Sequence, residues 1–326
     1  RMPTCSDISA TRPKIFSVIL NGGTYMFLNV LFYMAKLQNC RQTKEGSDLL
    51  MTNLVLENEF LRVEVSPLGA EMHSIWCKRT GCEQLWQGGD PKVWQDHAPR
   101  LFPLIGQLKD DHYLWQGKAY TMPMHGFASG KEFSVVEASP KAVTLRLEDT
   151  PETLTMYPFR FTLNITYTLE GESLKVKADV TPRETDEIYV SLGAHPGFYC
   201  QEGDVLELNA PAPLQCRRLC LDNHLLQPGT EEFAPDKLVL KGSLFDNDAI
   251  FLTDMAGEVT LKGGVSKRFV KVTYPGMKYV GFWHKPQTEA PYECIEPWMS
   301  VPSDENDSGD WNEKHAATVL EPDESW

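Results

Sequence analysis

The stretch FTLNITYTLEGESLKVKADV, residues 161–180, decides the fold class. Apolar residues alternate with polar residues from Phe161 to Leu169, and the alternation resumes from Leu174 to Val180. A period of two places every second side chain on the same face of a β-strand. The Glu-Gly-Glu-Ser segment between the two runs is typical of a hairpin turn. The stretch therefore predicts an antiparallel hairpin with one buried face.

Similar short runs recur on both sides of this hairpin. They occupy residues 61–65, 142–149, 258–263 and 269–275. No segment after residue 53 keeps the i, i+3, i+4, i+7 spacing of an amphipathic helix. Many short strands separated by Gly, Pro, Asn and Asp are typical of a β-sandwich or barrel. The chain is therefore predicted to be all-β.

Composition narrows the class of function. The 326 residues are 42% apolar and 23% charged, which is ordinary for a globular protein with one large core. The net charge of −14 and the lack of a long Lys/Arg run argue against a nucleic-acid partner. Eight cysteines without a C-x-x-C spacing favour free thiols over a disulfide scaffold or a structural zinc site.

The first 52 residues differ from the remainder. They contain the uncharged run 15–35, which is long enough to span a bilayer but is interrupted by polar residues at 21–24 and by Asn29. We predict that 1–52 is a leader outside the fold, with a membrane anchor or signal as the alternative. The domain is predicted to cover residues 53–326, and a chain without the leader is expected to fold unchanged.

Four stretches combine a proton carrier or hydrogen-bond donor with Gly, Pro and aromatic residues. They are residues 97–113, 122–133, 191–200 and 279–298. Glycine permits close approach of the backbone to a ligand. An aromatic face beside polar groups suits a sugar, which has an apolar C–H face and an edge of hydroxyls. These stretches are therefore the candidates for a ligand site.

Five motifs occur in a fixed order along the chain. They are NEFLRVEVSPLGAEMHSI, LFPLIGQLKDDHY…GKAYTMPMHGFA, GAHPGF, LFDNDAIFL and ECIEPW. Together they resemble the galactose mutarotase-like (aldose 1-epimerase) family, and more closely its bacterial sugar-epimerase branch. The resemblance implies one large antiparallel β-supersandwich in the cytoplasm. It also implies interconversion of the α and β anomers of a free hexose, such as galactose or glucose, without cofactor or metal.

The same resemblance suggests roles for particular residues. His195 of GAHPGF matches the family's general acid, and Glu296 of ECIEPW matches its general base. His125 and Asp248 match residues that bind sugar hydroxyls. His195, Glu296 and His125 each have a structural alternative: a histidine at a strand end, a loop carboxylate before Pro and a histidine in a capped turn. For Asp248 the alternative is that the nearby Asp246 is the matching residue.

Some positions depart from the family pattern. Gln107 stands where better characterised relatives carry a sugar-binding Arg. Its amide can still donate a hydrogen bond to the sugar but supplies no charge, and Arg100 is the candidate to replace the Arg. Ser129 and Lys131 replace the usual Arg-containing continuation of the HGFA motif. These departures keep two alternatives open: a carbohydrate-binding protein without turnover, and an epimerase of a phosphorylated sugar held by Arg100 and Lys131.

The ends of the chain carry a further expectation. AATVLEPDESW, residues 316–326, resembles the approach to the family's final strand. We therefore expect a neighbouring strand to lack part of its ladder. The sequence leaves the oligomeric state open, and a membrane partner is not expected for the domain.

Overall fold

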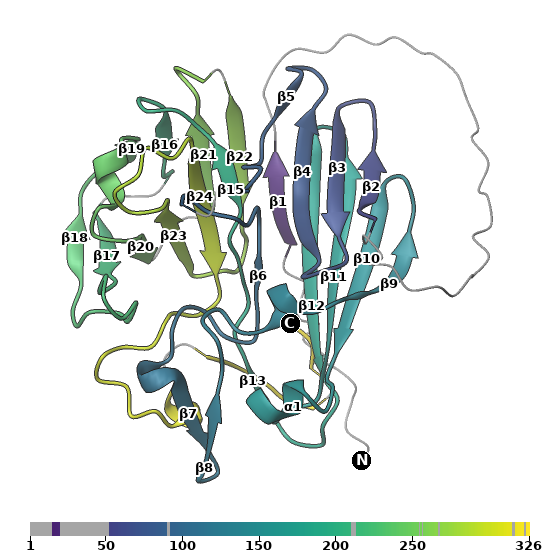
Figure 1. Cartoon of the computed structure of the whole chain (residues 1–326), viewed down its shortest axis with the longest axis vertical. Coiled ribbons are helices and arrows are strands. Elements are labelled where there is room, and N and C mark those ends of the chain that lie inside the picture. Colours follow the sequence, from purple (N-terminus) through teal and green to yellow (C-terminus); the bar gives the residue numbers. More distant parts are fainter. Residues whose placement is uncertain are drawn as a thin grey trace, which may run out of the picture.

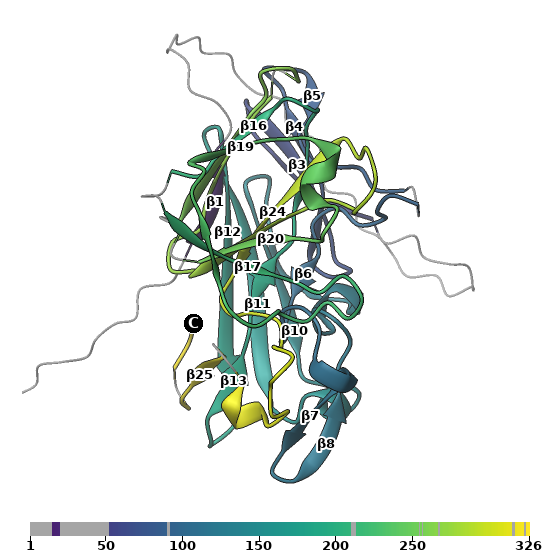
Figure 2. The ribbon, with the colours of Figure 1, turned by 90° about the vertical axis from the view of Figure 1, so that its left-hand side faces the viewer.

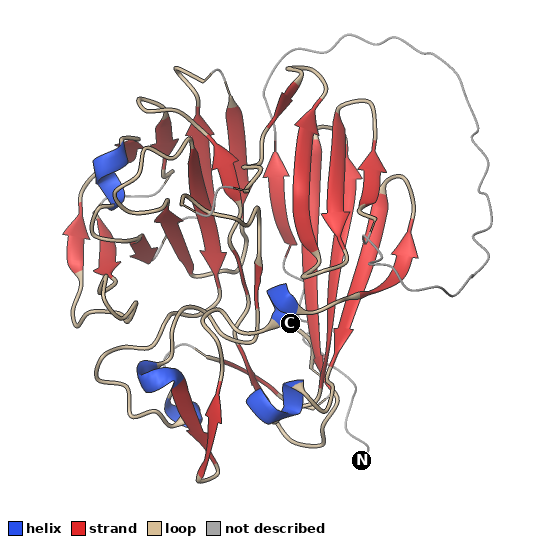
Figure 3. Cartoon of the chain, in the orientation of Figure 1, coloured by secondary structure: helices blue, strands red, loops and turns tan. Residues whose placement is uncertain are grey.

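Strands make up most of the regular structure. The computed structural model describes residues 15–19 (backbone only), 52–89, 92–209, 213–253, 255, 257–266, 268–314, 317–322 and 324–326. Helices within these ranges are short turns in the connections between strands (Figure 3). They are α1 (Thr153–Met156) and the 3₁₀ turns η1 (Lys109–Asp111), η2 (Ala128–Gly130), η3 (Gly242–Phe245) and η4 (Trp311–Glu313). The all-β prediction is confirmed.

The predicted hairpin lies in the largest sheet. Phe161–Glu170 and Ser173–Pro182 pair antiparallel along their whole length, closing at Glu170 and Ser173. Sheet order is β19 (Lys237–Val239), β16 (Val205–Glu207), β21 (Glu258–Lys262), β22 (Phe269–Thr273), β1 (Ile15–Ile19), β12 (Ser173–Pro182), β11 (Phe161–Glu170), β10 (Ala142–Glu148) and β9 (Ser134–Ala138).

A second sheet has eight strands. Its order is β18 (Glu231–Phe233), β17 (Leu214–Arg218), β20 (Ile250–Thr253), β23 (Tyr279–Trp283), β24 (Tyr292–Trp298), β14 (Gly193–Ala194) and β6 (Arg100–Leu101), with β15 (Gly197–Tyr199) also paired to β24.

Smaller sheets complete the fold. One has four strands, β2 (Leu54–Glu57), β3 (Leu61–Ser66), β4 (Glu71–Cys77) and β5 (Cys82–Glu83). Two more are the pairs β7 (His112–Trp115) with β8 (Lys118–Thr121), and β13 (Ile188–Val190) with β25 (Thr318–Leu320).

The three large sheets share one hydrophobic core. Val63 of the four-stranded sheet, Ile165 of the nine-stranded sheet and Phe282 of the eight-stranded sheet are all fully buried in the same cluster. Figures 1 and 2 show the long strands β10–β12 extending toward the end of the molecule where the hairpin β7–β8 projects. This arrangement agrees with the expected supersandwich. No helix among the described residues is long and apolar enough to cross a membrane.

Strand β1 differs from the expectation of a leader outside the fold. Residues 15–19 pair with residues 177–173 of β12 and, at 17–19, with residues 273–271 of β22 (Figure 1). Beside them, Trp326 exchanges two backbone hydrogen bonds of 3.2 Å with Val180 of β12. The ladder that we expected to be incomplete is therefore continued by β1, because β12 and β22 offer facing edges. The other residues of 1–51 lie outside the described part of the chain.

We expect removal of residues 1–50 to lower the Tm and promote aggregation, contrary to the prediction from sequence. Without β1 the facing edges of β12 and β22 lose their shared partner, and unpaired N–H and C=O groups invite pairing with other chains. Thermal unfolding and size-exclusion chromatography of a chain starting at Met51 measure the effect. Removal of residues 1–10 alone is the control. An unchanged Tm and a monodisperse peak after the longer deletion would contradict the prediction.

Candidate functional site

Strand register places the predicted acid and base opposite each other. His195 lies between β14 and β15, and both strands pair antiparallel with β24, which carries Glu296. Gly193, two residues before His195, pairs with Trp298, two residues after Glu296. Gly197, two residues after His195, pairs with Cys294, two residues before Glu296. Nε2 of His195 consequently lies 3.2 Å from Oε2 of Glu296. The GAHPGF and ECIEPW motifs thus meet through backbone pairing.

A cavity of about 240 Å³ opens above this pair. Three tryptophans and several polar side chains surround it. Its lining includes Trp94, Trp283, Trp298, Asp96, His125, His195, His224, Asp248 and Glu296. The indole of Trp94 lies 5.1 Å from the His195 ring and that of Trp283 lies 5.5 Å from it, centroid to centroid. The cavity therefore combines aromatic walls with a buried histidine–carboxyl pair.

Burial changes the proton affinity of both members of the pair. Glu296 is 2% exposed and His195 is 9% exposed. Desolvation raises the pKa of Glu296, and the nearby carboxyls of Glu293 and Asp248 raise that pKa further. Desolvation lowers the pKa of His195, and His125 lowers that pKa further. Near neutral pH the pair therefore holds one transferable proton and carries no net charge.

His125 presents a neutral donor to the cavity. Its Nδ1 accepts a hydrogen bond of 3.1 Å from the backbone N–H of Gly106, which assigns the ring proton to Nε2. Burial lowers the pKa of His125 to about 4, so the ring is neutral at pH 7. The residue has φ = 63°, a left-handed conformation that is uncommon outside glycine. This conformation fits a position held for function.

Asp248 and His224 form a second polar pair on the cavity. His224 Nδ1 lies 3.0 Å from Asp248 Oδ2, and Asp248 Oδ1 accepts the backbone N–H of Ala249 at 2.8 Å. Both residues are in the left-handed region, with φ of 56° at His224 and 69° at Asp248. Sequence reasoning missed His224, because its neighbours Asn223 and Leu225 give no Gly, Pro or aromatic signal. Trp94 was missed because it lies three residues before the first selected stretch, residues 97–113.

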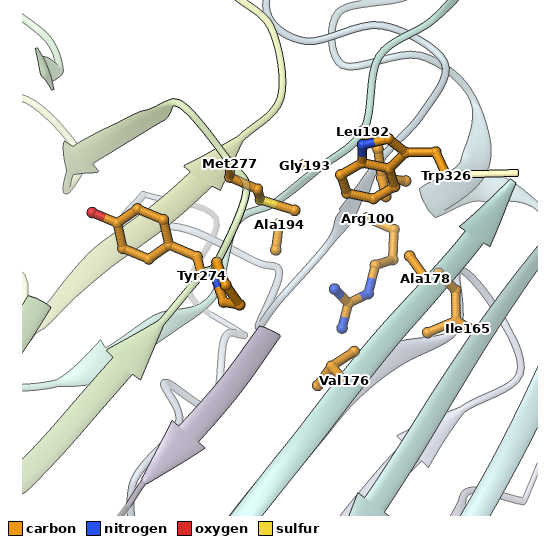
Figure 4. A pocket seen from close by; sticks show the side chains of 11 residues that line it. Arg100, Ile165, Val176, Ala178, Leu192, Gly193, Ala194, Tyr274, Met277 and Trp326 are labelled. Carbon is orange, nitrogen blue, oxygen red and sulfur yellow. The ribbon is translucent and has the colours of Figure 1, made fainter. Parts of the chain in front are cut away.

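Arg100 does not reach the cavity, contrary to the prediction. It begins β6 and pairs with Ala194 of β14, which directs its side chain between the sheets. There it is 5% exposed, and its Nη2 donates a 2.6 Å hydrogen bond to the hydroxyl of Tyr167. Figure 4 shows the guanidinium in a separate small pocket beside Val176 and Trp326. Arg100 is therefore a buried residue of the sheet interface.

Gln107 is also away from the cavity. Its side-chain amide donates to Asp111, and its backbone carbonyl accepts from the N–H of Ser303. The preceding Gly106 lines the cavity instead. Lys131 pairs with Glu152 at 2.7 Å and does not line the cavity either. Of the six predicted site residues, the structure brings together His125, His195, Asp248 and Glu296.

One group of side chains could hold a metal ion. Ligand atoms of His195, Cys294 and Glu296 lie within 4.8 Å of one another, and all three residues are buried.

Known proteins resemble this chain over nearly the whole domain. The family model for aldose 1-epimerase matches residues 52–326. Chromosomal protein LacX of Lactococcus lactis subsp. lactis is 30% identical over 284 residues, which cover 82% of this chain and 94% of that protein.

Solved structures give the same result. A galactose mutarotase related enzyme from Lactobacillus acidophilus is 29% identical, with a TM-score of 0.79 over 84% of this chain and 94% of that one. A galactose mutarotase-like protein from Lactobacillus casei is 27% identical, with a TM-score of 0.79 over 84% of this chain and 97% of that one. By sequence and by architecture, the chain belongs to the aldose 1-epimerase family.

Proposed function

We propose that this protein is an aldose 1-epimerase that interconverts the α and β anomers of a free hexose. The observation that carries the proposal is the His195–Glu296 pair, 3.2 Å apart and buried at a cavity with aromatic walls. Family membership and the similarity to galactose mutarotase-like structures support the same reaction.

Mutarotation needs one group that accepts a proton and one that donates a proton. The C1 hydroxyl loses a proton while the ring oxygen gains one, so the C1–O5 bond opens to an aldehyde. The aldehyde rotates about C1–C2 and closes on its other face by the reverse transfers. His195 and Glu296 together hold one proton to donate and one site that can accept a proton. Ring opening and ring closure each require one donor and one acceptor. Such positioned proton transfers contribute typically 10²–10⁴-fold each.

Other cavity residues are suited to orient the sugar. The Trp94 and Trp283 rings offer apolar faces for the C–H side of the pyranose. Asp248, 5% exposed, can accept hydrogen bonds from hydroxyls, while Nε2 of neutral His125 can donate one. The sequence resemblance suggests sugar binding for His125 and Asp248 only, so the proposed roles of the tryptophans rest on their geometry.

A phosphorylated substrate receives less support. The described residues that line the cavity include neither Lys nor Arg, whereas Asp96, Asp248 and Glu296 give the lining an acidic character. The two cations invoked from sequence, Arg100 and Lys131, both lie elsewhere. Lys285 lies in an adjoining hollow with His224, where a phosphate would have to reach beyond the main cavity.

Polarimetry tests the proposal. Freshly dissolved α-D-glucose or α-D-galactose changes its optical rotation slowly in buffer, and the protein should accelerate that decay in proportion to its concentration. An unchanged decay for both sugars, together with quenching of tryptophan fluorescence by either sugar, would instead support a carbohydrate-binding protein without turnover.

We expect kcat/KM to be level across neutral pH and to fall at both extremes. On the acidic side the pair gains a second proton at His195, whose pKa is lowered by burial. On the alkaline side the pair loses its only proton from Glu296, whose pKa is raised by burial. The two limbs therefore lie farther apart than the ordinary Glu and His values, and they belong to the pair as a unit. A single acidic limb centred near pH 6.5 in the pH–rate profile would contradict this reading.

A further inference from the structure

Cys294 completes a cluster of three different ligand types around the proton-transfer pair. It lies two residues before Glu296 on β24, and side chains two apart on a strand point to the same face. Nε2 or Nδ1 of His195, Sγ of Cys294 and a carboxylate oxygen of Glu296 all lie within 4.8 Å of one another. Tetrahedral zinc with ordinary bond lengths separates such atoms by roughly 3.3–3.6 Å. The His–Glu distance of 3.2 Å already fits, so a small movement of the thiol closes the site.

The carboxyl groups around this cluster favour a cation over an anion. Three buried carboxyls, those of Asp248, Glu293 and Glu296, are 5% exposed or less. In the described ion pairs each of them faces a histidine, and none faces Lys or Arg. A divalent cation would supply the positive charge that the site lacks.

We propose that His195, Cys294 and Glu296 form a binding site for Zn²⁺. A nitrogen, a sulfur and an oxygen ligand are the donor set that zinc accepts, whereas the hard cations Mg²⁺ and Ca²⁺ take oxygen ligands. Because His195 and Glu296 line the cavity, the fourth coordination position faces that space and is open to water or a sugar hydroxyl. Binding displaces the thiol proton of Cys294 and the proton held by the pair to solvent.

The consequence for activity rests on the proposed function. A metal bound to His195 and Glu296 occupies the lone pairs that proton transfer needs, so Zn²⁺ is an inhibitor of this site. Metal binding itself is independent of mutarotation, and it is measured separately.

Titration of the metal-free full chain with Zn²⁺ by calorimetry, and with Co²⁺ by absorption, tests the site. We expect one equivalent of Zn²⁺ to bind, and bound Co²⁺ to show a thiolate-to-cobalt charge-transfer band. Cys294→Ala should abolish that band and weaken Zn²⁺ binding at least about tenfold. The matched control is Cys216→Ala, which removes an equally buried thiol in β17, away from the cluster. This control should bind both metals like the unaltered protein.

Two results would overturn the proposal. They are equal Zn²⁺ affinity in the Cys294→Ala and unaltered proteins, and no Zn²⁺ binding by the unaltered protein at millimolar metal. If Cys294→Ala does not fold, the near-isosteric Cys294→Ser is titrated in its place, with the same expected loss of the cobalt band. In the unaltered protein, Zn²⁺ should slow mutarotation and a chelator should restore it. Cys294-dependent metal binding without any mutarotation would sustain the metal site and remove the proposed function.

Discussion

Replacing Glu296 by Gln, or His195 by Asn, is expected to slow the catalysed mutarotation at least roughly 10²-fold while the fold stays intact. Gln fills the space of Glu but cannot accept and return a proton. Asn keeps a polar side chain beside Glu296 and likewise cannot carry the proton. Because the two groups share one proton across 3.2 Å, losing either removes the transfer pathway of both. The double variant should therefore be hardly slower than the worse single variant.

Polarimetric rates with the preferred sugar measure the loss, and circular dichroism confirms folding. A suitable control is His284→Asn, which alters a similar buried His–carboxylate pair that does not line the cavity. That variant should retain a rate within about threefold of the unaltered protein once its folding is verified. A rate equally close to the unaltered one in Glu296→Gln or His195→Asn would refute the assignment.

The elements that sequence predicts well are those defined by local pattern. The hairpin at 161–180 follows from the alternation and the turn residues, because the two strands pair directly across a two-residue turn. Prediction of the proposed acid–base pair depended on the family resemblance as well as on the residue types. His195 and Glu296 lie 101 positions apart in the sequence, and the register of β14 and β15 on β24 brings them together.

The failures arise where side-chain direction depends on a distant partner. Arg100 was expected at the sugar because it lies seven residues before Gln107, in the same strand region of the sequence. The pairing of β6 with β14 turns its side chain toward Tyr167 instead. His224 reaches the cavity only because the turn after β17 folds back against Asp248. A single sequence contains neither of these tertiary constraints.

The placement of β1 is another such case. An apolar run of this length is compatible with a membrane segment, a leader or a strand, and periodicity does not separate these possibilities. Residues 15–19 form a strand because they pair with β12 on one side and with β22 on the other. Both partner strands lie more than 150 residues away in sequence.

Gly126→Ala is expected to reduce kcat/KM by about 10²-fold and to lower the Tm by at least about 5 °C. Gly126 has φ = 78°, which L side chains rarely adopt, and an added Cβ would lie well inside 3.0 Å of the backbone carbonyl of Phe102. The left-handed backbone and the overpacking together cost roughly 2–5 kcal/mol of stability. For a domain of this size each kcal/mol corresponds to about 2–4 °C.

The catalytic effect follows from the neighbouring residue. Relief of the clash must move the chain at His125, whose Nδ1 accepts the N–H of Gly106. The Nε2 of His125 is the proposed donor to the sugar. A displacement of about 1 Å in a positioning group is enough for a 10²-fold loss. Gly130→Ala is the matched control, because Gly130 ends the turn η2 nearby, has an ordinary φ and would place its Cβ in open space. If the two variants have the same Tm and the same kcat/KM, the tight contact at Gly126 does not hold His125 in place. If only Gly126→Ala loses both, the loop between β8 and η2 owes its donor geometry to a glycine that the HGFA motif places beside the histidine.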